Sequence, residues 1–151
     1  TLRYAVEDEP LGTAGGIRYA AEVGGIDERF VVCNGDVLTT LDLTEMVRFH
    51  DAHGGEATIH LCRVDDPSAF GVVPTRSNGE VMAFVEKPPP GRVPSHWINA
   101  GTYVLEPSVL DRIPPRLTVS VSLIRAASLF TRLLADRFRI LQPWHPRTLD
   151  R

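Results

Sequence analysis

Runs of apolar residues at extended spacing alternate with apolar residues at helical spacing along the first two thirds of the chain. The extended runs predict strands at Leu2–Val6, Arg29–Cys33, Ala57–Val64, Phe70–Val73, Val81–Val85 and Ala100–Leu105. A β-α-β-α-β order opens the chain and indicates a parallel sheet with helical crossovers. The later strands are closely spaced, as antiparallel strands are, so we expect an α/β fold with a mixed sheet.

Two helices are predicted between the first three strands. We expect Thr13 to cap the first helix and the pair Gly24–Gly25 to end it. Asp42 and Glu45 form a capping-box pattern at the start of the second helix, which should stop near Gly54–Gly55.

The rest of the chain reads differently. Pro114–Pro115 is a break, and helical spacing resumes over Ser122–Arg139 before a tail, Gln142–Arg151, with little apolar material. We therefore divide the chain into residues 1–121 and a C-terminal helix and tail at 122–151.

Length, composition and charge narrow the class of protein. The chain has 151 residues, 43% hydrophobic and 23% charged, which fits one globular domain. A net charge of -3 gives no reason to expect nucleic acid or an anionic membrane as partner. No apolar run approaches the ~20 residues that span a bilayer, and no signal peptide is visible, so we expect a cytoplasmic protein. Because the chain begins at Thr1 and enters a predicted strand at once, we expect that something upstream has been cut away or was never present.

The two cysteines, Cys33 and Cys62, both fall in predicted strands. We expect two buried thiols in a reducing compartment. A disulfide between them stays open, and no second ligand lies at metal-binding spacing.

The most informative motif is Asn34–Gly35–Asp36, directly after a predicted buried strand. Ligands of open α/β sheets lie beyond the carboxyl ends of the strands. Asp36 would present a carboxylate there, and hard cations such as Mg²⁺ prefer carboxylate oxygen. The same three residues are also a generic turn, and these two interpretations have about equal weight.

Three further motifs each have a functional and an ordinary interpretation. The small-residue loop Leu11–Gly16 opens a helix, where backbone N–H groups favour polar or anionic ligands. In Val85–Pro88, Glu86 is suited to sugar hydroxyls and Lys87 to a phosphate. In Ile98–Gly101, the Asn99 amide is suited to vicinal hydroxyls. Taken singly, they read as a helix start, a surface ion pair and a turn.

The order and spacing of these motifs resemble the sugar-1-phosphate nucleotidyltransferase family, and within it the members that use mannose 1-phosphate and GTP. The resemblance runs from about Glu7 to about Val121 and includes Phe70–Val73. It implies a Rossmann-like α/β/α fold and a reaction of a nucleoside triphosphate with a sugar 1-phosphate that yields a nucleotide sugar and pyrophosphate. GTP and GDP-mannose are favoured over thymidine or uridine nucleotides and glucose.

The resemblance also implies roles for individual residues. Gly12 and Thr13 would lie against the nucleobase, and Asp36 would hold Mg²⁺ as the catalytic metal ligand. Gly71 would line the sugar pocket. The sugar contacts would come from Glu86, from Lys87 as a catalytic contact to the sugar phosphate, and from Asn99.

This sequence departs from the family pattern at three places. The Gly-rich loop that cradles the triphosphate precedes these motifs in the family and is absent from this sequence. Val119–Val121 leads into Ser122–Ala127 without the family's acidic residues, and no Asp matches the family's second metal ligand, since Asp136 and Asp150 lie in the divergent part. The resemblance therefore leaves open a non-catalytic nucleotide-sugar-binding protein or an inactive truncated fragment. An incomplete sheet would expose a strand edge, which predicts low stability or association, and a homo-oligomer stays open.

Overall fold

The computed structural model describes residues 1–89 and 91–113. The predicted boundary at residue 121 and the helix predicted at Ser122–Arg139 lie outside these residues. In chain order the elements are α1 (Gly12–Gly24), β1 (Phe30–Cys33), α2 (Leu43–His53), β2 (Ala57–Arg63), β3 (Gly71–Val72), β4 (Val85–Glu86), β5 (Trp97–Leu105) and a 3-10 helix, η1 (Pro107–Arg112). No helix among these residues has the length and apolarity needed to cross a membrane.

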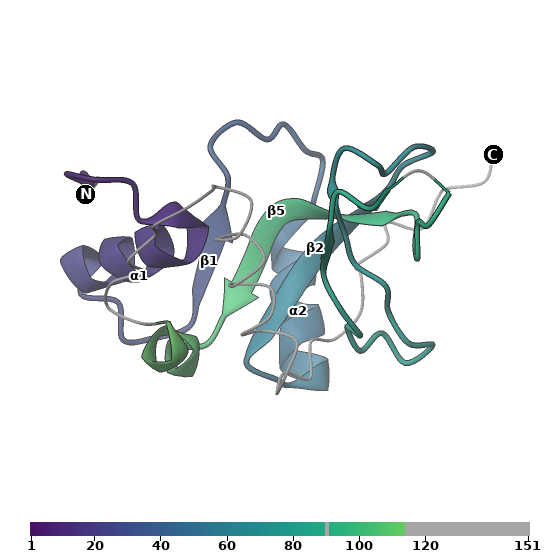
Figure 1. The fold of residues 1–151 in the computed structure, drawn as a ribbon. Helices are drawn as coiled ribbons and strands as arrows, with labels where there is room; N and C mark the ends of the chain where they lie inside the picture. The colour runs from purple at the N-terminus through teal and green to yellow at the C-terminus, as the bar shows by residue number, and fades with distance from the viewer. Residues whose placement is uncertain (90, 114–151) are drawn as a thin grey trace.

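β5 is the central strand of the sheet (Figure 1). β2 pairs along one edge of β5, and β1 and β3 pair with different parts of the other edge, with β4 next to β3. Every one of these pairs is antiparallel. β1 and β2 consequently run in the same direction and are joined by the crossover helix α2. They are not neighbours as a simple parallel sheet would require, because β5 lies between them. The predicted parallel pairing is wrong for the described strands.

Two strand predictions need correction. Leu2–Val6 forms no strand, and its apolar side chains are about three-quarters exposed. A short extended run is stable only when a ladder and a packed face support it, and here it has neither. The strand predicted at Val81–Val85 shrinks to β4 plus an isolated bridge between Thr75 and Val81. A turn connects the two bridge residues, with the Gly79 N–H donating to the Arg76 carbonyl.

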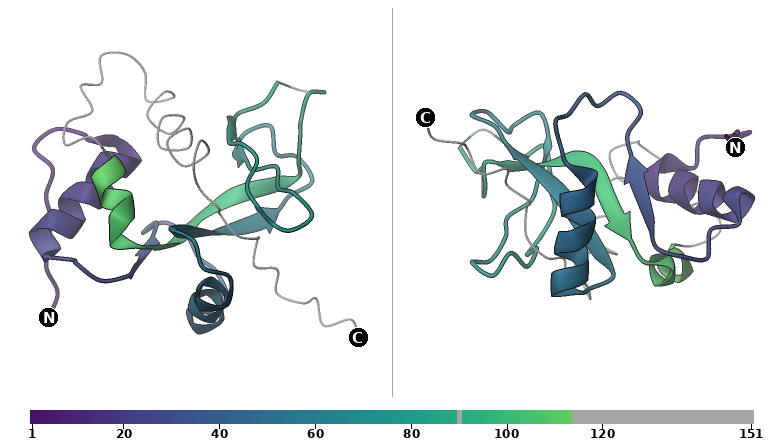
Figure 2. Two further views of the ribbon diagram at one scale, coloured as in Figure 1. Left: turned by 90° about the horizontal axis from the view of Figure 1, so that it is seen from below. Right: turned by 180° about the vertical axis from the view of Figure 1, so that it is seen from behind.

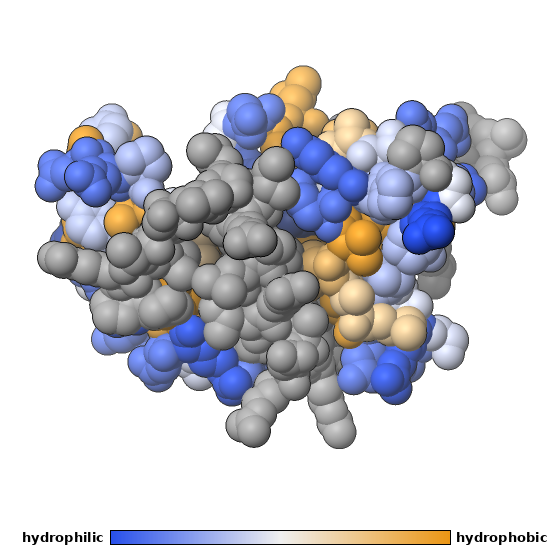
Figure 3. Space-filling model, viewed as in Figure 1, coloured by the Kyte–Doolittle hydropathy of each residue, from blue (hydrophilic) through white to orange (hydrophobic). Residues whose placement is uncertain are grey.

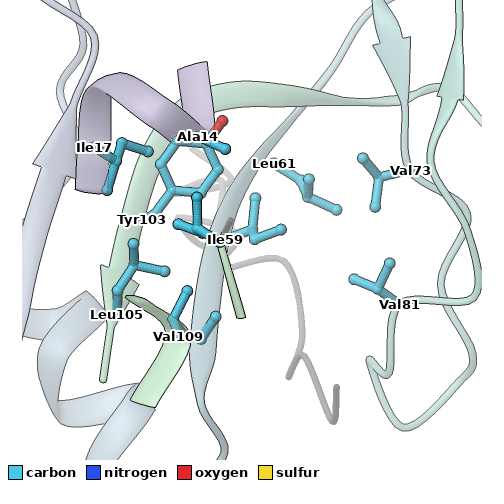
Figure 4. Packing of buried hydrophobic residues seen from close by; sticks show 11 residues of the cluster. Ala14, Ile17, Ile59, Leu61, Val73, Val81, Tyr103, Leu105 and Val109 are labelled. Atoms are coloured by element: carbon cyan, nitrogen blue, oxygen red, sulfur yellow. The ribbon is translucent and has the colours of Figure 1, made fainter. Parts of the chain in front are cut away.

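Helices cover both faces of the sheet, which makes the layers α/β/α. α1 and η1 lie on one side and α2 on the other, as the left view of Figure 2 shows. The main core lies on the α1 side, where alternate residues of β2 and β5 pack with α1 and η1 (Figure 4). Three of its members, Ile59, Tyr103 and Leu105, are at most 3% exposed. On the other face, Met46 of α2 is fully buried beside β2 and β5.

A polar network joins α2 to the sheet. The buried His50 lies 2.8 Å from the Thr58 hydroxyl through Nδ1 and 3.1 Å from Glu106 Oε1 through Nε2. Arg29 donates to the same Glu106 oxygen at 2.6 Å and also pairs with Asp51. Burial raises the pKa of Glu106, but the hydrogen bonds from Arg29 and His50 outweigh it and hold this pKa below its ordinary value. The network fixes the start of β1 against the end of β5.

The prediction of buried thiols is wrong, because both Cys33 and Cys62 are free and exposed. Val31 and Cys33 alternate along β1 with Phe30 and Val32, which pack against the main core, and Val31 is 40% exposed. β1 is also an edge strand of the described sheet. Further exposed apolar residues, Val37 and Leu38, follow in the loop after β1, and Figure 3 shows apolar side chains gathered where this loop runs in Figure 1.

The helix ends agree with the sequence except at one position. Gly25 ends α1 in the left-handed conformation, as predicted. The residue that precedes α1 is Leu11, whose side chain makes no capping bond, so the cap predicted at Thr13 is wrong. Asp42 caps α2 as predicted, because its Oδ1 accepts from the Thr44 and Glu45 N–H groups.

Asp42→Ala is expected to lower the free energy of unfolding by about 1 kcal/mol, because two N–H groups at the start of α2 lose their acceptor. Urea denaturation measures the change. Asp42→Asn keeps an acceptor oxygen at the same place and should lose much less. Equal losses of stability in the two variants would contradict the role of the Asp42 oxygen as the acceptor of these two hydrogen bonds.

Candidate functional site

A cleft of about 670 Å³ lies between α1 and β1. Residues of α1 between Gly12 and Ala21, the whole of β1 and the first two residues of the Asn34–Asp36 turn line it, together with Glu7, Pro10 and Ile26. Both residues predicted to contact the base, Gly12 and Thr13, are among the lining residues. The structure therefore brings the small-residue loop and the Asn34–Asp36 turn to the same cavity, although most of α1 and all of β1 lie between them in the sequence.

The backbone at the start of α1 is adapted to this cleft. Gly12 has φ 70°, in the left-handed region, so any other residue would be strained there. Gly16 allows a side chain to lie across the helix, because a β-carbon at this position would be 2.5 Å from Oε1 of Glu7. The other carboxylate oxygen of Glu7 accepts a hydrogen bond from the Leu11 N–H at 2.8 Å. The Glu7 carboxylate is thereby held at the first turn of α1, on the wall of the cleft.

Glu7 is a site residue that the sequence analysis missed. It is the only charged residue among the described residues that line the cleft. In the sequence it stands in an acidic stretch before Pro10, which reads as an ordinary surface loop. The signal that could have found it is the glycine at position 16, since a bare helix position in the first turns of α1 leaves room for a side chain from the preceding loop.

Asp36 lies at the end of β1, as the sequence predicts. It is exposed and belongs to a turn in which the Val37 N–H approaches the Asn34 carbonyl at 3.4 Å. Among the described residues, no hydrogen bond or ion pair engages its carboxylate. The Asp36 carboxylate therefore does not stabilise this turn, and its role as a metal ligand stays a prediction.

The donor set at Asp36 fits one kind of Mg²⁺ site. The described residues contain no group of three or more His, Cys, Asp or Glu side chains that could hold a metal ion. Mg²⁺ is commonly bound by one or two carboxylates while substrate phosphates and water supply its other ligands. The single exposed carboxylate of Asp36 beside the cleft suits that arrangement and not a closed protein cage.

Gly71 and Glu86, both predicted to contact the sugar, face each other across the β3–β4 ladder. A β-carbon at position 71 would lie 3.2 Å from Oε2 of Glu86, so the glycine leaves just enough room for the carboxylate. Both residues are half-buried. They are well separated in the sequence, and the antiparallel ladder makes them adjacent.

Lys87, the only lysine of the chain, has an unusual backbone. Its φ is 42°, and it is the only described residue other than glycine with a positive φ. Its N–H donates to the Phe70 carbonyl at 3.0 Å, which fixes this conformation at the end of β4, while the side chain is exposed. Strained conformations of this kind cluster at binding and catalytic sites.

Lys87→Gly is expected to raise the free energy of unfolding by about 0.5–1 kcal/mol, because glycine adopts a positive φ without strain. The same change removes the ammonium group predicted to contact a phosphate. Chemical denaturation and sugar-phosphate binding would be measured together. Lys87→Ala is the control, since it also loses the charge but keeps the strain. A loss of stability in the glycine variant would contradict the prediction.

Asn99 lies on β5, where its amide is already engaged. Its Oδ1 accepts from the Gly101 N–H at 3.0 Å, and its Nδ2 donates to the Tyr103 hydroxyl at 2.6 Å. Asn99 follows Ile98, which pairs with Val72 of β3. β3 also carries Gly71, so Asn99 and the Gly71–Glu86 pair lie on neighbouring strands. The amide retains one N–H and one acceptor lone pair for a ligand.

The predicted residues therefore form two groups. One group, Gly12, Thr13 and the turn that holds Asp36, surrounds the α1–β1 cleft. The other group, Gly71, Glu86, Lys87 and Asn99, lies on or next to β3, β4 and β5. The connection between them runs through Gly101, whose carbonyl accepts from the Asn34 N–H at 2.9 Å and whose N–H donates to Asn99.

The sequence of this chain is similar to the sequences of known nucleotidyltransferases. The family model described as nucleotidyl transferase matches residues 1–122. The mannose-1-phosphate guanylyltransferase of Mycobacterium tuberculosis is 44% identical over 137 residues, which cover 89% of this chain and 36% of that protein. A probable mannose-1-phosphate guanylyltransferase 2 of Arabidopsis thaliana is 50% identical over 115 residues, 74% of this chain and 31% of that protein. The chain thus spans about a third of the length of these relatives.

Solved structures show the same fold. HddC from Yersinia pseudotuberculosis, complexed with GMP-PN, is 31% identical with a TM-score of 0.58, over 72% of this chain and 45% of that chain. The UTP-bound UGPase of Acinetobacter baumannii is 25% identical with a TM-score of 0.64, over 89% of this chain and 50% of that chain. The predicted α/β nucleotidyltransferase fold is confirmed, and the described residues represent part of it.

Proposed function

This chain belongs to the nucleotidyl transferase family, and we propose that its protein transfers the nucleotidyl group of GTP to mannose 1-phosphate. The observation that carries the proposal is the arrangement of the two groups of residues, which are connected through Gly101 of β5. The cleft group suits a nucleotide, and the β3–β4–β5 group suits a phosphorylated sugar. The 44–50% identity to mannose-1-phosphate guanylyltransferases supports the choice of substrates.

The reaction needs positioning and charge neutralisation more than it needs a covalent nucleophile. A phosphate oxygen of the sugar 1-phosphate attacks the α-phosphorus of GTP. One P–O bond forms, the bond to the pyrophosphate oxygen breaks, and GDP-mannose and pyrophosphate are the products. Lys87 would hold the sugar phosphate, while Glu86 and Asn99 would orient the sugar through its hydroxyls. Asp36 would hold Mg²⁺, which neutralises phosphate charge when it is bound, and nucleotidyltransferases of this family generally use a divalent metal.

The Glu7 carboxylate favours guanine among the bases. Its Oε1 has no hydrogen bond among the described residues and lies on the cleft wall, while Oε2 is fixed by the Leu11 N–H. Guanine presents two adjacent donors, N1–H and N2–H₂, which one carboxylate can accept. Uracil and thymine present one donor between two carbonyl oxygens, which a carboxylate repels.

Glu7→Gln is expected to reduce the preference for GTP over UTP by about ten- to a hundredfold, the range that a good bidentate pair contributes to base discrimination. The amide keeps the shape of the side chain and an acceptor for the Leu11 N–H, so the fold should be unchanged. The ratio of kcat/KM for the two nucleotides measures the effect. Glu9→Gln is the matched control, because Glu9 is exposed in the same loop and does not line the cleft. An unchanged ratio in Glu7→Gln would exclude this role.

The test of the proposed function is pyrophosphate release by the protein expressed from the complete reading frame that contains this sequence. GTP with mannose 1-phosphate should be turned over faster than UTP or dTTP with glucose 1-phosphate. A folded protein without any release would contradict the proposal. Binding of GDP-mannose would then indicate the non-catalytic binding protein, and its absence the inactive fragment. A homo-oligomer and a cytoplasmic location stay predictions.

A further inference from the structure

β5 carries an irregularity at the point where the two groups of predicted site residues meet. Ile59 of β2 pairs with Tyr103, and Leu61 pairs with Asn99. A single residue of β2 therefore lies opposite three residues of β5, Ala100 to Thr102. Bulges of this kind end regular pairing locally and re-aim nearby groups, and they occur next to active sites.

The residue at the centre of this bulge is Gly101, which is buried and has φ 72°. Its two peptide groups point to different parts of the site. The carbonyl accepts from the Asn34 N–H at 2.9 Å, two residues before Asp36. The N–H donates to Oδ1 of Asn99 at 3.0 Å, and the Asn99 amide is held from its other end by the Tyr103 hydroxyl.

The side chain of Asn34 fills the space beside Gly101. A β-carbon at position 101 would lie 2.8 Å from Cγ of Asn34, closer still to its Nδ2, and 3.2 Å from its Cβ. Contacts of a β-carbon under about 3 Å essentially never occur in proteins, so one partner would have to shift. The partner of Gly101 is Asn34, which begins the Asn34–Asp36 turn, and even its Cβ, at 3.2 Å, would be closer than nine in ten such contacts in proteins. Gly25, by contrast, has nearly the same φ, 65°, and a β-carbon at that position would meet nothing within 4 Å.

We propose that Gly101 is a positioning residue that sets the place of the Asp36 carboxylate relative to the Asn99 amide. It does so through one bulged segment that bonds to both partners and through a bare Cα against which Asn34 packs. The inference rests on the proposed function for the roles of Asp36 and Asn99. The mechanical coupling itself depends only on the contacts of Gly101 and Asn34.

The coupling is tested with Gly101→Ala, Gly25→Ala and the double variant Gly101→Ala/Asn34→Ala. Gly25→Ala is the matched control for backbone strain. In the double variant Cγ and Nδ2 of Asn34 are gone, and only its Cβ remains near position 101. The first readout is the ¹H–¹⁵N spectrum, in the signals of Gly35 and Asp36. The second is the Mg²⁺ concentration that gives half-maximal pyrophosphate release.

Gly101→Ala is expected to move the Gly35 and Asp36 signals and to raise the half-maximal Mg²⁺ concentration at least fivefold. Removing the Asn34 side chain should restore most of both, while Gly25→Ala should change neither. Identical signals in the wild type and in Gly101→Ala would overturn the proposal. The same holds if the double variant does not restore the signals and the Mg²⁺ response that Gly101→Ala changes. If the wild type releases no pyrophosphate, the proposed function fails. The ¹H–¹⁵N spectra then still test whether Gly101 positions the Asn34–Asp36 turn.

Tyr103→Phe gives a second test if Gly101→Ala does not fold. It removes the hydroxyl that accepts from Asn99 Nδ2 and leaves the bond between Gly101 and Asn34 in place. The KM for mannose 1-phosphate should rise at least threefold with an unchanged Mg²⁺ response, because Asn99 loses a partner while the bond between Gly101 and Asn34 stays in place. A change in the Mg²⁺ response with an unchanged KM would contradict the assignment.

Discussion

Asp36→Asn is expected to lower the rate of pyrophosphate release by about a hundredfold or more. The substitution keeps the size of the side chain and removes the negative charge that we propose for the metal. Removing a single group that stabilises charge in the transition state commonly costs an enzyme on the order of a hundred- to a thousandfold in rate. The fold should not change, because no hydrogen bond or ion pair of the described residues engages the Asp36 carboxylate.

The measurement is kcat with saturating Mg²⁺, GTP and mannose 1-phosphate, accompanied by thermal denaturation. Asp111→Asn serves as the control, since Asp111 is an exposed carboxylate on η1. A variant Asp36→Asn with near wild-type activity would remove Asp36 from the site. Equal losses in both variants would point to a general effect of charge.

The largest effect on stability is expected for Leu105→Ala, which should lower the free energy of unfolding by about 2–5 kcal/mol. Leu105 is fully buried at the end of β5, where it lies between Phe30 of β1 and Ala57 of β2. The removed atoms would leave a cavity between α1, η1 and the sheet. The same change would loosen the strand that carries Asn99 and Gly101.

Chemical denaturation followed by circular dichroism measures this loss. Leu38→Ala is the control with the same change in composition, because Leu38 is fully exposed in the loop after β1. It should change the free energy of unfolding by no more than about 0.5 kcal/mol. Similar values for the two variants would mean that the described core does not hold the sheet together.

Exposed apolar residues bear on the predicted tendency to associate. Leu2, Tyr4 and Val6 before α1, and Val37 and Leu38 after β1, are all at least 40% exposed. β1 is an edge strand of the described sheet, and such edges pair readily with other chains. Association and low stability remain predictions, which sedimentation and a melting curve of this chain would test.

The sequence by itself predicted both helices, most of the strands and the residues of the candidate site. Gly25 ends α1 and Asp42 caps α2 because these are local effects of backbone conformation and of one hydrogen-bonding side chain. The motif order from Gly12 to Asn99 also indicated the family without any structure. The resemblance was sufficient because the motifs keep their spacing along the chain.

Only the tertiary structure decided which strands are neighbours. β5 enters between β1 and β2 although β3, β4 and long loops separate it from them in the sequence, and periodicity carries no information about pairing partners at that distance. In the sheet that this long-range pairing forms, none of the described strands pairs with Leu2–Val6. The pairing also left Cys33 exposed, because Cys33 alternates with Phe30 and Val32, which pack against the core.

The sequence analysis missed two roles, that of Glu7 on the wall of the cleft and that of Gly101 as the link between the two groups of site residues. It missed both for the same reason. Glu7 depends on the space above Gly16, and the role of Gly101 depends on the bulge opposite β2 and on the side chain of Asn34. Each is a contact between segments that are separate in the sequence. Local patterns specify what a residue is able to do, whereas the packing of distant segments specifies what it is next to.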